Sequence, residues 1–152
     1  MTAEEVHALG RKICEHLGLT YDVGTGEYYE RYSSSHGSGI TIGEYQDMEE
    51  MLVSVFHEIG HCRKCTVLKK FYAEISEHYA KVPRDTKLCN EGCFLLRYGR
   101  EYRAWKWGLK AMRLLSIKVT PKMIQFANES LETYNRTTEY GTEPEGSIGK
   151  EF

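Results

Sequence analysis

The sequence lacks a strong charge of either sign, and it lacks any long apolar run. Its 20 Lys and Arg nearly balance its 22 Asp and Glu, which leaves a formal net charge of −2. This balance gives no global electrostatic reason to expect binding to nucleic acid or to an anionic membrane. No apolar stretch approaches the roughly 18–20 residues that span a bilayer. The N-terminal segment MTAEEVHALGRKICEHLG also lacks the basic and apolar regions of a secretion signal. We therefore expect a cytoplasmic protein that binds neither nucleic acid nor membrane, and the oligomeric state stays open.

A cytoplasmic location predicts that the five cysteines are reduced thiols or metal ligands rather than disulfides. Four of them form two pairs, Cys62 with Cys65 and Cys89 with Cys93, whose spacings are compatible with a four-thiolate structural zinc site. The alternatives are unlinked thiols, or disulfides if the chain meets an oxidising compartment. Cys14 is interpreted as an ordinary helix residue.

The length of 152 residues suits one domain with a hydrophobic core, and no internal repeat is present. We predict an α+β domain over residues 1–136, with a cysteine-bearing insert at 62–97 and a flexible tail at 137–152. Apolar periodicity predicts helices over 2–17, 47–62 and 98–116, and Thr120-Pro121 opens a final helix. A Gly-, Ser-, Tyr- and Thr-rich stretch at about 27–45 predicts two or three short strands. A small antiparallel or mixed sheet would then pack on the helix of 47–62, with a mostly helical body after it.

The run HEIGH, from His57 to His61, lies inside the helix predicted for 47–62. Because residues i and i+4 project from one face of a helix, His57 and His61 could each offer a ring nitrogen to one zinc ion at about 2.0–2.1 Å. Glu58 is rotated by roughly 100° from His57, so it can accept a proton from an activated water and pass it to a leaving amine. An isolated HExxH string can also arise by chance on a metal-free helix.

A catalytic zinc ion usually takes three protein ligands and keeps one position open. Cys65 would lie about 12 Å from His57 along a straight helix, so it suits one ion poorly. The acidic and histidine candidates downstream are Glu74, Glu77, His78, Asp85, Glu91 and Glu101.

Glu101 is the favoured third ligand, with Glu77 and His78 as the main competitors. Ala104 and Gly108 lie on its side of the predicted helix and would let the helix of 47–62 pack closely. Gly60 would likewise ease the approach of another element, because it has no side chain. The alternative interpretation of Glu101 is a first-turn carboxylate that complements the helix dipole.

With HEIGH on one helix and GREYRAWKWGLKAM on a second, the chain resembles the zincin metallopeptidases of the gluzincin type. Within these it is similar to the ImmA/IrrE-like group and to small phage or prophage HExxH proteins, best over residues 40–116. The resemblance implies an N-terminal helix, a short sheet whose edge strand precedes the HExxH helix, and a later helix with a ligand Glu followed by Ala. The cysteine-bearing insert and the lack of an additional DNA-binding domain depart from relatives that cleave a repressor.

The resemblance also implies where a substrate would bind. An extended peptide would add to the edge strand through main-chain hydrogen bonds. The residues in that position are Gly39, Ile40, Thr41 and Ile42. The candidates to stabilise the oxyanion are Tyr98, Tyr102, His36 and His78.

The predicted function is that of a zinc-dependent peptidase acting on a protein or peptide. His57, His61 and Glu101 would be the ligands of one catalytic Zn²⁺, and Glu58 would be the general acid and base. A second, structural ion at the cysteine pairs is a further option. The alternatives are a phage-encoded, non-proteolytic binding or regulatory module with structural zinc, and a metal-free helical domain. An intact Glu58 favours the enzyme, since a structural site needs no base there.

Overall fold

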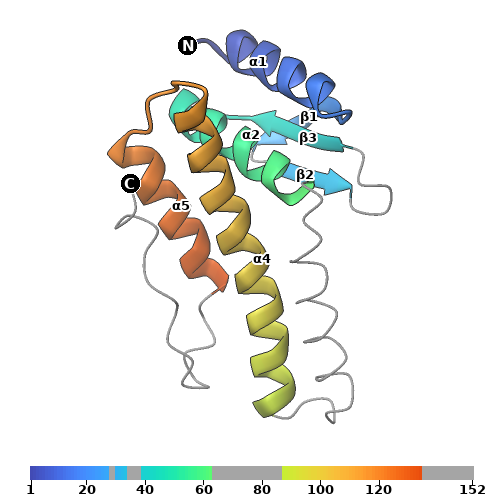
Figure 1. Cartoon of the computed structure of the whole chain (residues 1–152), viewed down its shortest axis with the longest axis vertical. Coiled ribbons are helices and arrows are strands. Elements are labelled where there is room, and N and C mark those ends of the chain that lie inside the picture. Colours follow the sequence, from blue (N-terminus) through green and yellow to red (C-terminus); the bar gives the residue numbers. More distant parts are fainter. Residues whose placement is uncertain (28–29, 34–38, 63–86, 135–152) are drawn as a thin grey trace.

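The computed structural model of the chain describes residues 1–27, 30–33, 39–62 and 87–134, with side chains over 1–24, 39–62 and 99–133. These residues form four helices and one three-stranded sheet, so the predicted α+β class is confirmed (Figure 1). The helices are α1 (Ala3–His16), α2 (Met48–Cys62), α4 (Lys87–Leu114) and α5 (Pro121–Tyr134). The strands are β1 (Thr20–Glu27), β2 (Glu30–Ser33) and β3 (Gly39–Glu44). None of the described helices is both long and apolar enough to cross a bilayer. Most of the predicted insert and all of the predicted tail lie outside the described residues.

The first helix begins as its sequence dictates. Thr2 accepts a hydrogen bond from the amide of Glu5, and the Glu5 carboxylate accepts one from the amide of Thr2. This reciprocal pair satisfies two amides that the first helical turn leaves without partners. α1 buries Val6, Gly10 and Cys14 and leaves Leu17, just after its end, half exposed.

The sheet has the order β1-β3-β2, so β3 is its central strand. β1 pairs with β3 in parallel, from Thr20 opposite Gly39 to Val23 opposite Ile42. β2 pairs with β3 in antiparallel fashion, from Glu30 opposite Ile42 to Ser33 opposite Gly39. The prediction that Gly39–Ile42 form an edge strand is therefore wrong. Both sides of this strand are occupied by neighbours, and a peptide could pair with it only by displacing one of them.

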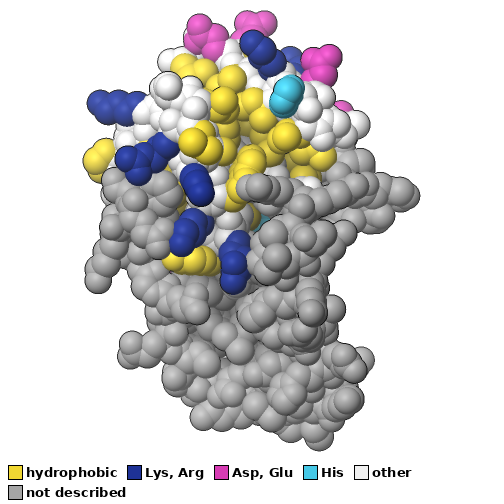
Figure 2. Space-filling model, viewed as in Figure 1, with side chains coloured by type: hydrophobic (Ala, Val, Ile, Leu, Met, Phe, Trp, Pro, Cys, Tyr) yellow, Lys and Arg dark blue, Asp and Glu magenta, His cyan; other side chains and the backbone are white. Residues whose placement is uncertain are grey.

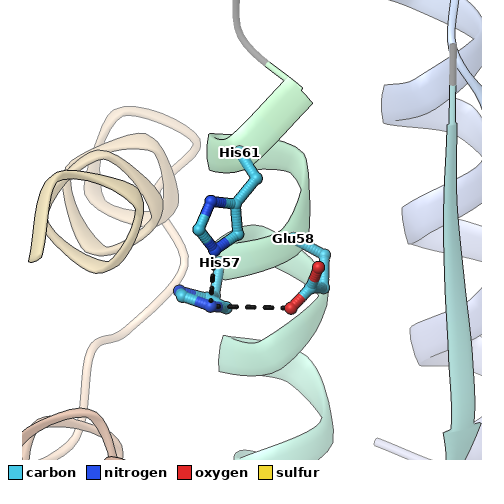
Figure 3. Close-up of side chains that lie close together, drawn as sticks. All are labelled: His57, Glu58 and His61. Atoms are coloured by element: carbon cyan, nitrogen blue, oxygen red, sulfur yellow. Dashed lines mark hydrogen bonds and ion pairs between the residues drawn. The ribbon is translucent and has the colours of Figure 1, made fainter. Parts of the chain in front are cut away.

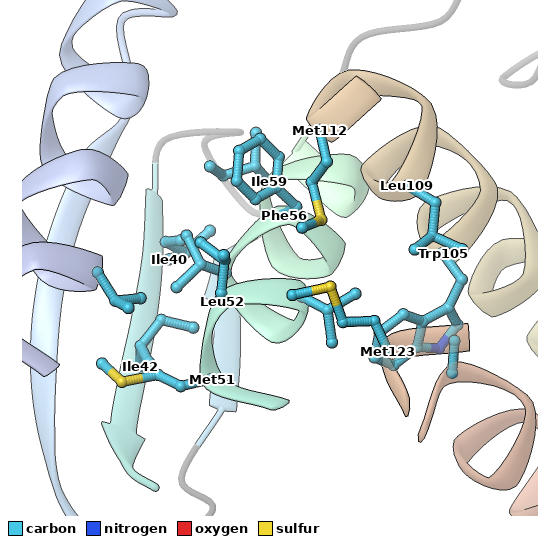
Figure 4. Close-up of a cluster of buried hydrophobic side chains, with 14 of the residues drawn as sticks. Ile40, Ile42, Met51, Leu52, Phe56, Ile59, Trp105, Leu109, Met112 and Met123 are labelled. Atoms are coloured by element: carbon cyan, nitrogen blue, oxygen red, sulfur yellow. The ribbon is translucent and has the colours of Figure 1, made fainter. Parts of the chain in front are cut away.

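Helix α2 lies at the centre of the part of the chain that the structure describes. It is buried almost all round, which is the pattern expected of a helix enclosed on every side. Figure 4 shows the sheet residues Ile40 and Ile42 on one side of α2 and residues of α4 and α5, such as Leu109 and Met123, on the other. Removing each such side chain from water stabilises the fold by about 1.5–3 kcal/mol.

Helix α4 begins at Lys87, well before the predicted start at residue 98, and runs for 28 residues. Glu101 therefore lies near the middle of a helix, and its interpretation as a first-turn carboxylate is wrong, because the helix dipole acts only at the ends. α5 begins as predicted at Thr120-Pro121, where the Thr120 hydroxyl accepts a hydrogen bond from the amide of Met123 at 3.3 Å.

Candidate metal centre

Helix α2 is fixed at its N-terminus by Asp47. One carboxylate oxygen of Asp47 accepts hydrogen bonds from the amides of Glu49 at 2.9 Å and Glu50 at 3.1 Å. The other oxygen forms an ion pair with Lys122 of α5. The Lys122 hydrogen bond and the two amides hold the pKa of Asp47 below its usual value. The helix that carries HEIGH is thus tied to α5 at one end.

His57 and His61 point their rings toward one place, one turn apart on α2 (Figure 3). Their Nε2 atoms are 3.1 Å apart. His57 is only 4% exposed, and its Nδ1 has no hydrogen-bond partner among the described residues. Its ring instead stacks on Trp105 of α4, with centroids 3.8 Å apart and planes 23° from parallel.

Helix α4 brings Glu101 to the same place. Glu101 Oε2 lies 3.1 Å from His57 Nε2 and 3.2 Å from His61 Nε2. Together with the distance between the two rings, these contacts form a nearly equilateral triangle of two nitrogens and one oxygen. For comparison, ligand atoms held at 2.0–2.1 Å by a tetrahedral zinc ion are about 3.3 Å apart. The triangle therefore has the size that a small tetrahedral ion requires.

Two glycines allow the helices to approach this closely. A Cβ on Gly60 would lie 2.7 Å from the carbonyl oxygen of Ala104, and a Cβ on Gly108 would lie 3.0–3.1 Å from the backbone of Phe56 and His57. The close packing predicted from Gly60, Ala104 and Gly108 is confirmed. These contacts hold the backbone of α4 against that of α2 within two turns of Glu101.

The charges of these residues suit a cation. Burial is the main cause that lowers the pKa of His57 to about 4, so the ring is neutral and its Nε2 can carry a lone pair at neutral pH. Burial alone would raise the pKa of Glu101, but hydrogen bonds and charge interactions with His57 and His61 outweigh it and lower the pKa to about 2. Three electron-rich atoms in so small a buried space favour a bound cation. The donor set thus fits a metal ion.

No protein-family model, curated protein or solved structure matches the chain. The function must therefore follow from the donor set and its surroundings. On α2, His57, Glu58 and His61 form a largely buried group that could hold a metal ion. All of its donor atoms lie within 4.8 Å of one another.

Glu58 completes this group from the side of the sheet. Its Oε1 is 3.5 Å from His57 Nε2, and the residue is 5% exposed. The neighbouring Cys62 packs against β3, where its thiol donates a hydrogen bond to the carbonyl of Gly39 at 3.5 Å. Burial, followed by the nearby charge of Glu58, raises the pKa of Cys62 to about 11, so this thiol stays protonated. The C-terminal end of α2 is thereby held against the central strand.

Among the other residues that the sequence singles out, Tyr102, Cys62 and Cys14 have described side chains. Tyr102 is half-buried on α4, with its ring centroid 5.8 Å from Lys106 Nζ. Cys62 and Cys14 are free thiols, buried in the core. The remaining predicted positions lie outside the described residues or have side chains outside them: His36, Cys65, Glu74, Glu77, His78, Asp85, Cys89, Glu91, Cys93 and Tyr98.

Trp105 is the residue whose role the sequence did not indicate. Trp105 is 2% exposed. It lies four residues after Glu101, and therefore on the same face of α4 one turn later. That spacing is the signal that could have placed it beside a ligand of the same ion.

Proposed function

We propose that the chain is a zinc-dependent hydrolase of peptide bonds, with His57, His61 and Glu101 as ligands and Glu58 as general acid and base. The observation that carries the proposal is the triangle of donor atoms with sides of 3.1, 3.1 and 3.2 Å. Two histidines and one glutamate are a ligand set of catalytic zinc sites, which keep a fourth position open. Structural zinc sites instead are closed by four protein ligands, mostly cysteines. A ligand glutamate from a second helix also supports the gluzincin type.

The residues of the chain divide the work. When bound, zinc polarises the carbonyl of the scissile bond and lowers the pKa of a water in its open position. Glu58 accepts the proton of the attacking water and delivers it to the amine nitrogen as the C–N bond breaks, which restores the carboxylate. Trp105 keeps the His57 ring in orientation, because Nδ1 of that ring has no hydrogen bond among the described residues to do so.

The substrate strand must be reassigned, since β3 is central. Among the described strands, β1 and β2 each pair on one side only. Of these two, β2 lies against α2, whereas β1 lies against α1. A strand at the edge of a sheet offers main-chain N–H and C=O groups to an extended peptide. We therefore propose β2 as the strand that binds the substrate backbone.

Metal binding is tested by measuring zinc content and affinity in purified protein. Wild type should hold one zinc ion per chain, and Glu101→Ala should lose affinity by more than about 100-fold, since loss of a mere supporting residue already costs 10–100-fold. Glu132→Ala removes an exposed glutamate of α5 and is the matched control. Wild-type affinity in Glu101→Ala would refute this ligand, and an absence of stoichiometric zinc in wild type would refute the metal site.

Hydrolysis is tested by comparing peptides released from a host lysate by wild type and by Glu58→Gln. Glu58→Gln should retain zinc and lower the rate by about 10²–10⁴-fold, the usual contribution of a general acid or base. Loss of zinc in this variant would instead make Glu58 a fourth ligand and the site a structural one. Retained zinc with no cleavage in either protein would favour the non-proteolytic binding module.

A further inference from the structure

A second feature lies apart from the metal centre, in a trough between α1 and the C-terminal end of α4. Its volume is about 770 Å³, and Phe56 of α2 contributes to its lining. Its two walls are apolar stripes of one helix each: Leu9, Ile13 and Leu17 on the side of α1, and Trp107, Ala111 and Leu114 on the side of α4. Within each stripe the residues are spaced by three or four, so they share one face of their helix. The proposed ligands and base do not line the trough.

Exposed apolar side chains are concentrated at the trough. Among the described residues, five large apolar side chains are markedly exposed: Met1, Leu17, Val23, Leu114 and Leu115. Three of these five, Leu17, Leu114 and Leu115, line the trough. Single exposed apolar residues are normal, but their gathering at one place marks a binding surface. Figure 2 shows apolar side chains gathered on one face of the molecule, with Lys and Arg side chains along one border and Asp and Glu side chains at the upper edge.

The charges on the α4 side of the trough are mostly positive. Residues 99–119 contain six Lys and Arg, and their one acidic residue is Glu101 in the metal centre. On α4, Lys110 and Arg113 are exposed and directly precede the trough residues Ala111 and Leu114. Lys12 lines the wall of α1, where Glu15 is the one acidic lining residue. The chain as a whole carries a net charge of −2, so this positive charge is local.

We propose that the trough is a docking surface for an acidic amphipathic helix of a partner protein. Two helical walls with little direct contact between them leave room for a third helix, whose apolar stripe would cover the exposed leucines. Leu17 lies eight residues after Leu9, about 12 Å along the helix axis, which is close to the roughly 10.5 Å between apolar anchors at i and i+7 of a bound helix. Acidic residues on the flanks of that helix would face Lys12, Lys110 and Arg113. A polyanion such as duplex DNA would satisfy these charges but leave the leucines in water.

The test uses the full chain and two fluorescein-labelled 18-residue helical peptides. Both carry leucine at i, i+4 and i+7, and their flanks are glutamate in one and lysine in the other. By fluorescence anisotropy, the glutamate peptide should bind at least about tenfold more tightly than its lysine twin, and salt should weaken it. Glu58→Gln should bind the glutamate peptide as wild type does, so this result is independent of the proposed hydrolysis.

Variants locate the binding. Leu114→Glu should weaken binding of the glutamate peptide at least about tenfold, as should Lys110→Glu, because they oppose its leucines and its carboxylates respectively. Val23→Glu is the matched control: Val23 on β1 is 47% exposed, Leu114 is 77% exposed, and both changes add the same charge. Val23→Glu should stay within about twofold of wild type. Leu114→Ala, which adds no charge, keeps the test valid if Leu114→Glu does not fold.

Four results would overturn the proposal. They are equal binding of the two peptides, no binding of either, an equal loss in Val23→Glu, and displacement of the glutamate peptide by duplex DNA. Sedimentation of wild type and Leu114→Glu tests a fifth result that would overturn the proposal. A dimer that Leu114→Glu converts to a monomer would assign the trough to a second copy of this chain.

Discussion

Adding one methyl group at Gly60 should separate the two helices that carry the proposed ligands. The new Cβ would lie 2.7 Å from the carbonyl oxygen of Ala104 and 3.0 Å from its Cα. Favourable contacts of carbon begin near 3.5 Å, so α2 and α4 must part by roughly 0.5–1 Å. The obstacle is backbone, which cannot rotate aside as the tip of a side chain could. Ala104 lies one turn after Glu101, so Glu101 would move away from His57 and His61 by a similar distance.

Two opposing contributions set the stability of Gly60→Ala. Alanine is favoured over glycine inside a helix by about 1 kcal/mol. Overpacking a tight contact costs about 1–3 kcal/mol. The difference between this gain and this cost is a net loss of about 0–2 kcal/mol in the free energy of unfolding of the metal-free variant.

Zinc affinity should fall further, because donor positions in a metal site are defined to within about 0.2 Å. We expect a loss of about 10–100-fold, as for the removal of other supporting residues. Gly108→Ala provides a graded comparison, since its Cβ would meet the backbone of Phe56 and His57 at the milder distances of 3.0–3.1 Å. Its loss should be smaller.

The assay combines urea unfolding of the metal-free proteins with zinc titration against a chromophoric chelator. The reasoning is refuted if Gly60→Ala is more stable than wild type by about 1 kcal/mol, the full helical preference of alanine, and also keeps wild-type zinc affinity. The two helices would then have room for the methyl group. A greater loss in Gly108→Ala than in Gly60→Ala would contradict the order given by the distances.

Three further predictions concern the surroundings of the site. Asp47→Ala should lower the free energy of unfolding by about 1 kcal/mol at pH 7. The pKa of Asp47 is lowered in the folded protein, so its contribution to the free energy of unfolding is complete above the ordinary carboxyl pKa and is lost as pH falls through the folded value. The free energies of unfolding of the variant and wild type should therefore converge in acid. Trp105→Leu should lower the free energy of unfolding by about 3 kcal/mol and the zinc affinity about tenfold. Trp105→Phe can still stack on His57, so its zinc affinity, measured by titration, should stay within about threefold of wild type. Burial, followed by repulsion from the thiolate that Cys62 forms only at similarly high pH, raises the pKa of Cys14 to about 11. Native Cys14 should therefore react with iodoacetamide at pH 8 about 100-fold more slowly than in urea, as measured by peptide mapping.

The half of the site on α2 could be predicted from sequence because it depends on local spacing. His57 and His61 share a helix face, and the residues around them fill the core, so the helical period alone places both rings. Glu101 is forty residues away, yet its approach left a local trace in Gly60, Ala104 and Gly108. Small residues in register on two helices predict close packing, and this packing is present.

The predicted start of α4 at residue 98 was wrong, and Gly99 lies inside the helix that begins at Lys87. A glycine inside a helix costs about 1 kcal/mol, which tertiary packing readily outweighs. The stacking of Trp105 on His57 could not be predicted, since it depends on how two helices meet rather than on either one.

Strand order was the other failure, and its cause is general. β1 and β2 are separated in the sequence by residues 28–29 alone, which favours a hairpin, yet β3 lies between them. The apolar alternation of Ile40 and Ile42 specifies a buried face but not which strands lie alongside. A central and an edge strand can therefore carry the same pattern.

The reassignment of the substrate strand to β2 predicts a pattern of period two in the substrate. Once a cleaved peptide is in hand, each backbone nitrogen near the cleaved bond can be methylated in turn. An added strand points its N–H groups toward the edge at alternate residues only, so alternate methylations should lower kcat/KM about tenfold, the value of one main-chain hydrogen bond. The residues between them should tolerate the methyl group within about twofold, because their N–H groups face away from the sheet. If every position is equally sensitive, the methyl groups act by steric bulk in the active site; if none is, the substrate does not bind as a strand, and β2 has no part in its recognition.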